Sequence, residues 1–130
     1  MASKLAKSKA NPRSMYWKNK ADKAWGKYIH KRDEGCLVCG TTSKRTEAHH
    51  LISRARVITR HSPENGVLLC SYHHKFCPNE SPHAAPLQFS EFLFENHPEK
   101  YDWFLKNRFA TGVVDYEKSY YDLKKLIEGL

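Results

Sequence analysis

Two pairs of metal-binding residues constrain this chain more than any other feature of its sequence. Cys36 and Cys39 are separated by two residues, and Cys70 and His73 repeat that separation. Two residues of separation let both side chains face a single ion, and Gly40 frees the turn that follows the first pair. Three thiolates and one imidazole form a tetrahedral set that suits structural zinc. The 30 residues between the two pairs are too many for the zinc finger that reads DNA, which has about 12.

Two alternatives to this zinc site have to be weighed: a different fourth ligand, and disulfide bonds in place of metal binding. Cys77 is the alternative to His73 as the fourth ligand, although the separation of two residues favours His73. Four cysteines would also allow two disulfides in a secreted protein. However, the first 15 residues lack the apolar run of a secretory signal, and no stretch approaches the roughly 20 apolar residues of a membrane helix. We therefore expect a soluble, cytoplasmic protein without a membrane partner, in which closely spaced cysteines bind metal.

Positive charge is concentrated in the first half of the chain. Residues 1–60 contain 15 Lys and Arg against 4 Asp and Glu, a net charge of +11. Residues 61–130 contain 7 against 10, a net charge of −3. This asymmetry favours a polyanionic partner such as a nucleic acid, contacted mainly through the first half. The alternative is that the charge only keeps the domain soluble.

The pattern of apolar residues predicts a basic arm followed by one domain. Residues 1–13 are rich in lysine and contain Pro12, which predicts a flexible basic arm. Residues 14–130 are expected to form a single domain, with a core at about 35–90 and a helical C-terminal part at about 86–130. Within that domain the sequence predicts, in order, a helix at about 15–32, a strand at 46–52, a strand at 66–69, a short helix from 71, and helices at 86–96, from 98 and from 116.

Three further histidines, His49, His50 and His74, exceed what the zinc site needs. A zinc ion held by four protein ligands is closed and has no open position for a substrate. On a strand, adjacent side chains point to opposite sides, so His49 and His50 are not expected to share one role. One of them is suited to hold a second metal, and the other to act as a general base.

The arrangement of these residues resembles the HNH endonuclease family. The separations His50-x14-Asn65-x8-His74 match the spacing of the family motif. The frame around them, from the Cys36 pair through Glu-Asn-Gly-Val to the histidines that end at His74, looks like that of many phage and bacterial members. The resemblance covers roughly residues 36–90. It implies an α+β fold in which a zinc-stabilised ββα-metal core is flanked by N- and C-terminal helices, with the active site between hairpin and helix.

The resemblance also implies a role for each motif residue. His49 takes the place of the first metal ligand, where many relatives have aspartate. His50 takes the place of the general base. Asn65 takes the middle place, which usually fixes the hairpin loop and in some relatives ligates metal. His74 takes the place of the metal ligand on the helix. His83 resembles the third metal ligand of a phage subgroup, and the alternative is a histidine in a surface loop.

A site rich in histidine limits the metals expected at the catalytic centre. With histidine at position 49, the site favours Zn²⁺, Ni²⁺ or Mn²⁺ more than an aspartate site would. Mg²⁺ remains an option, with waters and phosphate completing its coordination. The expected cofactors are therefore structural Zn²⁺ and one catalytic divalent metal, and the sequence does not choose among the four ions.

Arginines between the two predicted strands complete the expected site. The guanidinium groups of Arg54, Arg56 and Arg60 match the geometry of phosphate oxygens, with Arg54 the first choice, and the alternative is a solvated basic loop.

The sequence thus predicts an enzyme that hydrolyses DNA, by nicking or by double-strand cleavage. One alternative is a non-catalytic, zinc-stabilised DNA-binding module. Another is the nuclease subunit of a phage packaging complex with a terminase as partner. The oligomeric state is not predicted.

Overall fold

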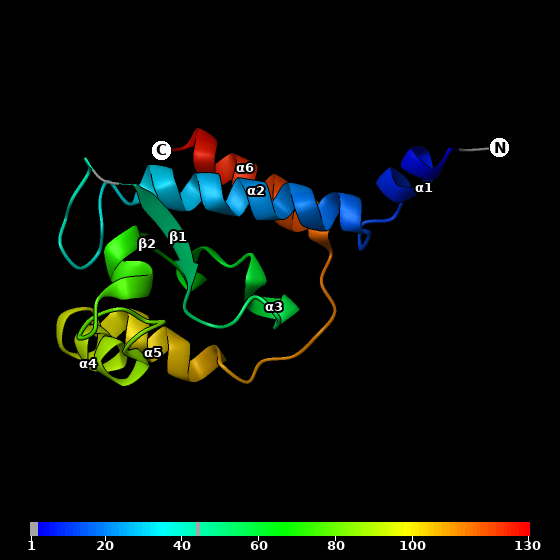
Figure 1. Cartoon of the computed structure of the whole chain (residues 1–130). Helices are drawn as coiled ribbons and strands as arrows, with labels where there is room; N and C mark the ends of the chain where they lie inside the picture. The colour runs from blue at the N-terminus through cyan, green and yellow to red at the C-terminus, as the bar shows by residue number, and fades with distance from the viewer. Residues whose placement is uncertain (1–2, 44) are drawn as a thin grey trace.

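The fold places a small β-hairpin between two layers of helices. The structure is a computed structural model that describes residues 3–43 and 45–130 (Figure 1). The elements in chain order are α1 (Lys4–Ala10), α2 (Met15–Arg32), β1 (Thr46–His50), α3 (Val57–Arg60), the 3-10 helix η1 (Pro63–Asn65), β2 (Gly66–Cys70), the π-helix η2 (Tyr72–Phe76), α4 (Pro86–Asn96), α5 (Pro98–Asn107) and α6 (Tyr116–Glu128). Helices α2 and α6 lie on one side of the hairpin, and α4 and α5 lie on the other (Figure 1). The expected α+β architecture is confirmed.

The hairpin pairs β1 and β2 in antiparallel register. Thr46 lies opposite Cys70 at one end of the ladder, and His50 lies opposite Gly66 at the other. The first strand ends at His50 rather than at residue 52, because the Ile52 amide donates to the side chain of Asn65 instead of continuing the ladder. The short helix predicted from residue 71 is present as a π-helix, closed by the Cys77 amide donating to the Tyr72 carbonyl at 2.8 Å.

Strand β2 is buried on both faces, so it joins two hydrophobic cores. Val67 and Leu69 pack with Phe89 and Leu93 of α4 on one face. Leu68 points to the other face, where it packs with the buried side of α2 and with α6. Because successive strand residues alternate between faces, β1 must also present neighbouring residues to different layers.

Helix α2 packs closely against the end of the hairpin. The predicted apolar face is buried at Trp17, Ala21, Ala24, Trp25 and Ile29. A β-carbon added at Gly66 would collide with Ile29 and Trp25, so only glycine allows this close approach of strand and helix. The contact sets the distance between α2 and the end of the hairpin where His50 lies opposite Gly66.

The N-terminal segment differs from the expected flexible arm. Residues 1 and 2 lie outside the described part, and Lys4–Ala10 form helix α1, which has no buried residue. The Trp17 indole donates to the Lys9 carbonyl at 2.9 Å, and the Pro12 carbonyl accepts a hydrogen bond from the Tyr116 amide at 2.9 Å. These contacts attach the end of the segment to α2 and α6. Within residues 3–43 and 45–130, no helix is long and apolar enough to span a membrane.

Candidate active site

The first candidate metal-binding group contains the four residues that the paired spacing predicted. Sulfur and nitrogen atoms of Cys36, Cys39, Cys70 and His73 lie within 4.8 Å of one another. The Sγ atoms of Cys39 and Cys70 are 3.9 Å apart, close to the edge of about 3.8 Å that Zn–S bonds of about 2.3 Å give in a tetrahedron. The Nδ1 atom of His73 is 3.2 Å from the Cys70 sulfur. This geometry suits zinc.

The surroundings of the cluster favour a thiolate at Cys36, whereas burial raises the pKa of the Cys39 thiol. Burial alone would raise the pKa of the Cys36 thiol, but hydrogen bonds from the backbone of Cys39 and Cys70 lower it below its usual value. In the turn that carries Cys36 and Cys39, the Gly40 amide donates a hydrogen bond to the Cys36 carbonyl at 2.7 Å, and Gly40 has a φ of 73°. A left-handed residue is needed there, which explains the glycine.

The alternative ligand, Cys77, lies outside the group of four. Its sulfur is instead close to His73 and Glu80. The structure therefore brings His73, rather than Cys77, to the other three cysteines.

The second candidate metal-binding group consists of three imidazoles from three parts of the chain. His49 comes from β1, His74 from η2, and His83 from the loop before α4. The Nε2 atom of His74 lies 3.2 Å from His49 Nδ1 and 3.0 Å from His83 Nε2. Three nitrogens that converge on one point fit a divalent metal that keeps open positions for substrate.

The loop that carries His83 is fastened to η2 by a fully buried serine. The Ser81 hydroxyl donates to the His74 carbonyl at 2.8 Å and accepts from the His83 amide at 3.3 Å. This link explains how a histidine nine residues beyond His74 reaches the same point.

The residue Glu47 contacts His74 of this group, and the sequence did not predict this contact. Its carboxylate oxygen lies 3.2 Å from His74 Nδ1. A proton on Nδ1 that donates to Glu47 leaves the lone pair of Nε2 free for a metal. Glu47 stands two residues before His49 on β1, so strand alternation places both on the same face and was the signal available for finding it.

The electrostatics of His49 and His83 keep the lone pairs of these two imidazoles available. Burial, and then the neighbouring His74 and His83, lower the pKa of His49 to about 3. Burial also lowers the pKa of His83. Neutral imidazoles are the form that binds metal.

The side chain of His50 points to the other face of β1, toward α2. Its ring stacks on Trp25 with centroids 3.8 Å apart and an angle of 10° between the planes. Its Nε2 atom is 3.0 Å from the Arg60 carbonyl oxygen, so the Nε2 proton donates there and Nδ1 carries the lone pair. Burial lowers the pKa of His50 to about 4, so the ring is neutral at pH 7 and can accept a proton.

The residue Asn65 is fully buried and uses its amide to hold the loop between the strands. Its Oδ1 atom accepts from the Ile52 amide at 2.6 Å, and its Nδ2 atom donates to the Ile52 and Thr59 carbonyls at 3.1 and 3.0 Å. Of the two roles that the resemblance implied, this geometry supports fixing the loop and leaves no side-chain oxygen directed at the metal group.

The three loop arginines do not share one role. The guanidinium of Arg60 forms a two-pronged ion pair with Asp22 of α2, with both N–O distances 2.8 Å. Its phosphate contact stays a prediction. The backbone carbonyl of Arg60 orients His50. Arg56 lies 5.8 Å from the ring of Phe109, and Arg54 lines the cleft beside the histidines.

The anchor of Arg60 also involves a buried histidine. His61 Nε2 lies 2.6 Å from Asp22 Oδ1. Burial alone would raise the pKa of Asp22, but hydrogen bonds from Arg60 and His61 lower it below its usual value. The carboxylate is therefore charged, and it fixes the segment that presents the Arg60 carbonyl to His50.

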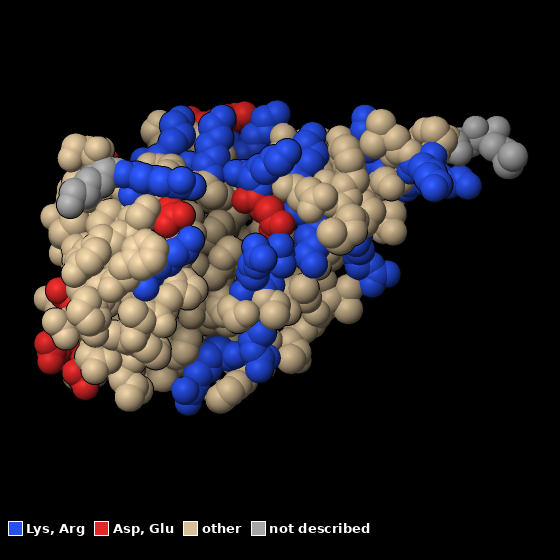
Figure 2. Space-filling model, viewed as in Figure 1, with Lys and Arg blue, Asp and Glu red and all other residues tan. Residues whose placement is uncertain are grey.

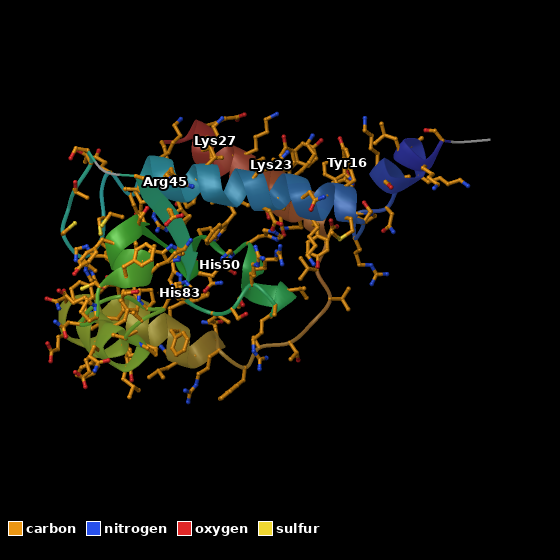
Figure 3. All side chains as sticks on the ribbon, viewed as in Figure 1. Tyr16, Lys23, Lys27, Arg45, His50 and His83 are labelled. Atoms are coloured by element: carbon orange, nitrogen blue, oxygen red, sulfur yellow. The ribbon has the colours of Figure 1, made fainter. Side chains whose placement is uncertain are left out.

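The group of His49, His74 and His83 lines the same cleft as His50. This cleft has a volume of about 620 Å³ and lies between the hairpin and helices α4 and α5. Its walls include His49, His50, His74, His83 and Arg54. Figure 3 shows His50 below α2 and His83 beside the α4 layer. Lys and Arg side chains gather over α2 and near α3 (Figure 2). The arrangement can hold a metal, accept a proton and attract a phosphate in one place.

Comparison with known proteins agrees with this geometry. Residues 36–76 match the sequence model of a family described as HNH endonuclease. No curated protein and no solved structure showed significant similarity to the chain. The matched segment contains the hairpin, the four residues of the first candidate metal-binding group, and His50, Asn65 and His74. Membership of this family would indicate nuclease activity in general. Residues 36–76 are therefore similar in sequence to the HNH endonuclease family.

Proposed function

We propose that the chain is a metal-dependent endonuclease that hydrolyses DNA phosphodiester bonds. The observation that carries the proposal is the convergence of a neutral proton acceptor and three metal-binding nitrogens on one cleft. A module that only bound DNA would need neither His50 with an unshared lone pair nor the His49, His74 and His83 group. The positive net charge of residues 1–60, +11, supports a nucleic acid as the substrate.

The metal would be held by His49, His74 and His83. When bound, it supplies positive charge that stabilises the phosphate oxygens and the leaving 3′ oxygen. The chain's own residues perform the remaining steps. Arg54 binds a phosphate oxygen at the cleft, because a guanidinium matches its geometry.

The proton is taken by His50. Its Nδ1 atom removes a proton from a water whose oxygen forms a bond to phosphorus, and the bond from phosphorus to the 3′ oxygen breaks. The leaving oxygen gains a proton from solvent, which gives a 5′-phosphate and a 3′-hydroxyl. The Arg60 carbonyl stabilises the charged ring through the Nε2 proton, and the stacked ring of Trp25 holds its orientation.

We also propose that residues 14–130 act as one domain. Strand β2 contributes to both hydrophobic cores, so the layer of α2 and α6 and the layer of α4 share its burial. A phage origin and a terminase partner, which the resemblance suggested, find no support in the family match and are not part of the proposal.

The proposal is tested by plasmid nicking with a panel of Mg²⁺, Mn²⁺, Ni²⁺ and Zn²⁺. The wild-type protein should convert supercoiled plasmid to nicked or linear forms with at least one ion. The His50→Ala variant should lose roughly 10²–10⁴-fold of the rate while keeping its metal content. His97→Ala removes a histidine outside the cleft lining and should cut normally. Wild-type activity in His50→Ala would refute the role of the base.

A further inference from the structure

The wall of the cleft formed by α4 and α5 is apolar and aromatic. Phe89 and Leu93 of α4 and Tyr101 and Phe104 of α5 line the cleft together with the histidines. Among the residues that the structure describes, Arg54 is the only lysine or arginine in this lining. A cleft that bound only a phosphate backbone would be lined mainly by cations and polar groups. The apolar wall therefore indicates that the cleft also binds an apolar part of its ligand.

The aromatic wall begins directly beside the metal-binding group. The Phe89 ring lies 6.1 Å from the His49 ring, edge to face at 90°. Phe89 and Leu93 are buried core residues, whereas Tyr101 and Phe104 are half-buried and keep surface in the cleft. The Tyr101 ring is held by edge contact with Phe94 at 5.3 Å. The wall therefore offers ring surface at a fixed place next to the expected scissile phosphate.

A nucleobase is the part of the substrate that fits such a wall. Bases stack on aromatic side chains in proteins that bind single strands, whatever their sequence. The volume of about 620 Å³ falls within the range of sites that enclose one small ligand, which suits one or two nucleotides. In a duplex, the faces of each base are covered by its neighbours, so a base can reach this wall only after leaving the stack.

We infer that the α4–α5 wall binds an unstacked base next to the scissile phosphate, and that the preferred substrate is single-stranded or unpaired DNA. This inference rests on the proposed nuclease function. The Tyr101 and Phe104 rings provide the stacking surface, and Arg54, which also lines the cleft, takes the phosphate. A duplex loses stacking energy before it can enter, whereas a single strand does not.

The test compares cleavage of one sequence as a single strand and as a duplex, with the metal that is most active in plasmid nicking. Wild-type protein should cut the single strand faster. Phe104→Leu and Tyr101→Leu keep apolar volume but remove the aromatic face, and each should slow single-strand cleavage roughly 5- to 150-fold. Duplex cleavage should fall much less. Phe109→Leu is the matched control, because its ring is 71% exposed and lies outside the cleft lining.

Two further measurements separate the possible failures. Zinc content and thermal melting of each variant identify any that has unfolded. Binding of a strand containing 2-aminopurine to His50→Ala reports stacking without cleavage, and adding Phe104→Leu to that variant should remove the quenching. Equal cleavage of both DNA forms, or equal losses on both in the leucine variants, would overturn the inference. If no DNA is cut with any metal, the proposed function fails, while the quenching still decides whether the wall binds a base.

Discussion

Replacing Glu47 with glutamine should weaken the catalytic metal site without disturbing the zinc site. The change keeps the size of the side chain but removes the charge that faces His74 Nδ1 at 3.2 Å. The hydrogen bond to His74 lowers the pKa of Glu47, so the residue is a carboxylate at neutral pH. A neutral amide makes Nε2 of His74 a weaker metal ligand, because the proton on Nδ1 is held less strongly.

The magnitude follows from the geometry of this contact. Loss of the carboxylate that orients a metal-binding histidine typically lowers metal affinity about 10- to 100-fold. The distance of 3.2 Å is longer than the 2.7–2.9 Å typical of strong charged hydrogen bonds, and Lys75 already shares the carboxylate at 3.8 Å. We therefore expect Glu47→Gln near the lower limit, about 10-fold or about 1.4 kcal/mol. Glu47→Ala should lose more.

The assay is calorimetric titration of Mn²⁺ into protein that retains its zinc. Glu99→Gln is the matched control, because Glu99 also lies beside a histidine, His97 at 3.9 Å, but outside the cleft lining. It should bind Mn²⁺ like the wild type. Unchanged melting would show that Glu47→Gln remains folded. Wild-type affinity for Mn²⁺ in folded Glu47→Gln would refute the positioning role.

Three other predictions address the zinc, the pH dependence and the packing. Dialysed protein should contain about one zinc per chain, and Cys36→Ser should lose it and unfold, whereas Cys77→Ser should keep it, as metal analysis and circular dichroism would report. Because the pKa of His50 is lowered to about 4, cleavage at saturating Mn²⁺ should persist below pH 6.5 and fall only toward pH 4. The unfolded chain takes up this proton at its ordinary pKa of 6.5, so the free energy of unfolding should decrease as the pH falls from 6.5 to about 4. A rate decline centred at 6.5 would contradict the burial of the ring. Gly66→Ala should cost roughly 1–3 kcal/mol in urea unfolding, whereas Gly26→Ala, whose new methyl group meets nothing within 4 Å, should not destabilise the fold.

The sequence by itself was sufficient for the features that depend on local spacing. The periodicity of apolar residues predicted the bounds of α2 and α4, because a helix repeats its buried face every three or four residues. The separation of two residues within each ligand pair predicted the group of four around Cys36, because a pair so close in sequence can face one ion. Alternation along a strand predicted opposite surroundings for His49 and His50.

Tertiary structure alone decided which distant groups meet. Glu47 lies 27 residues from His74 and Asp22 lies 38 residues from Arg60, so local spacing does not show that either pair is in contact. The pairing with Asp22 holds the segment in which the Arg60 carbonyl orients His50, a contact that the sequence did not predict. The sequence left His83 open, and packing brought it within 3.0 Å of His74 through the buried Ser81 link. Such contacts depend on how the hairpin and the helices pack, because side chains far apart in sequence become neighbours only when both cores have formed.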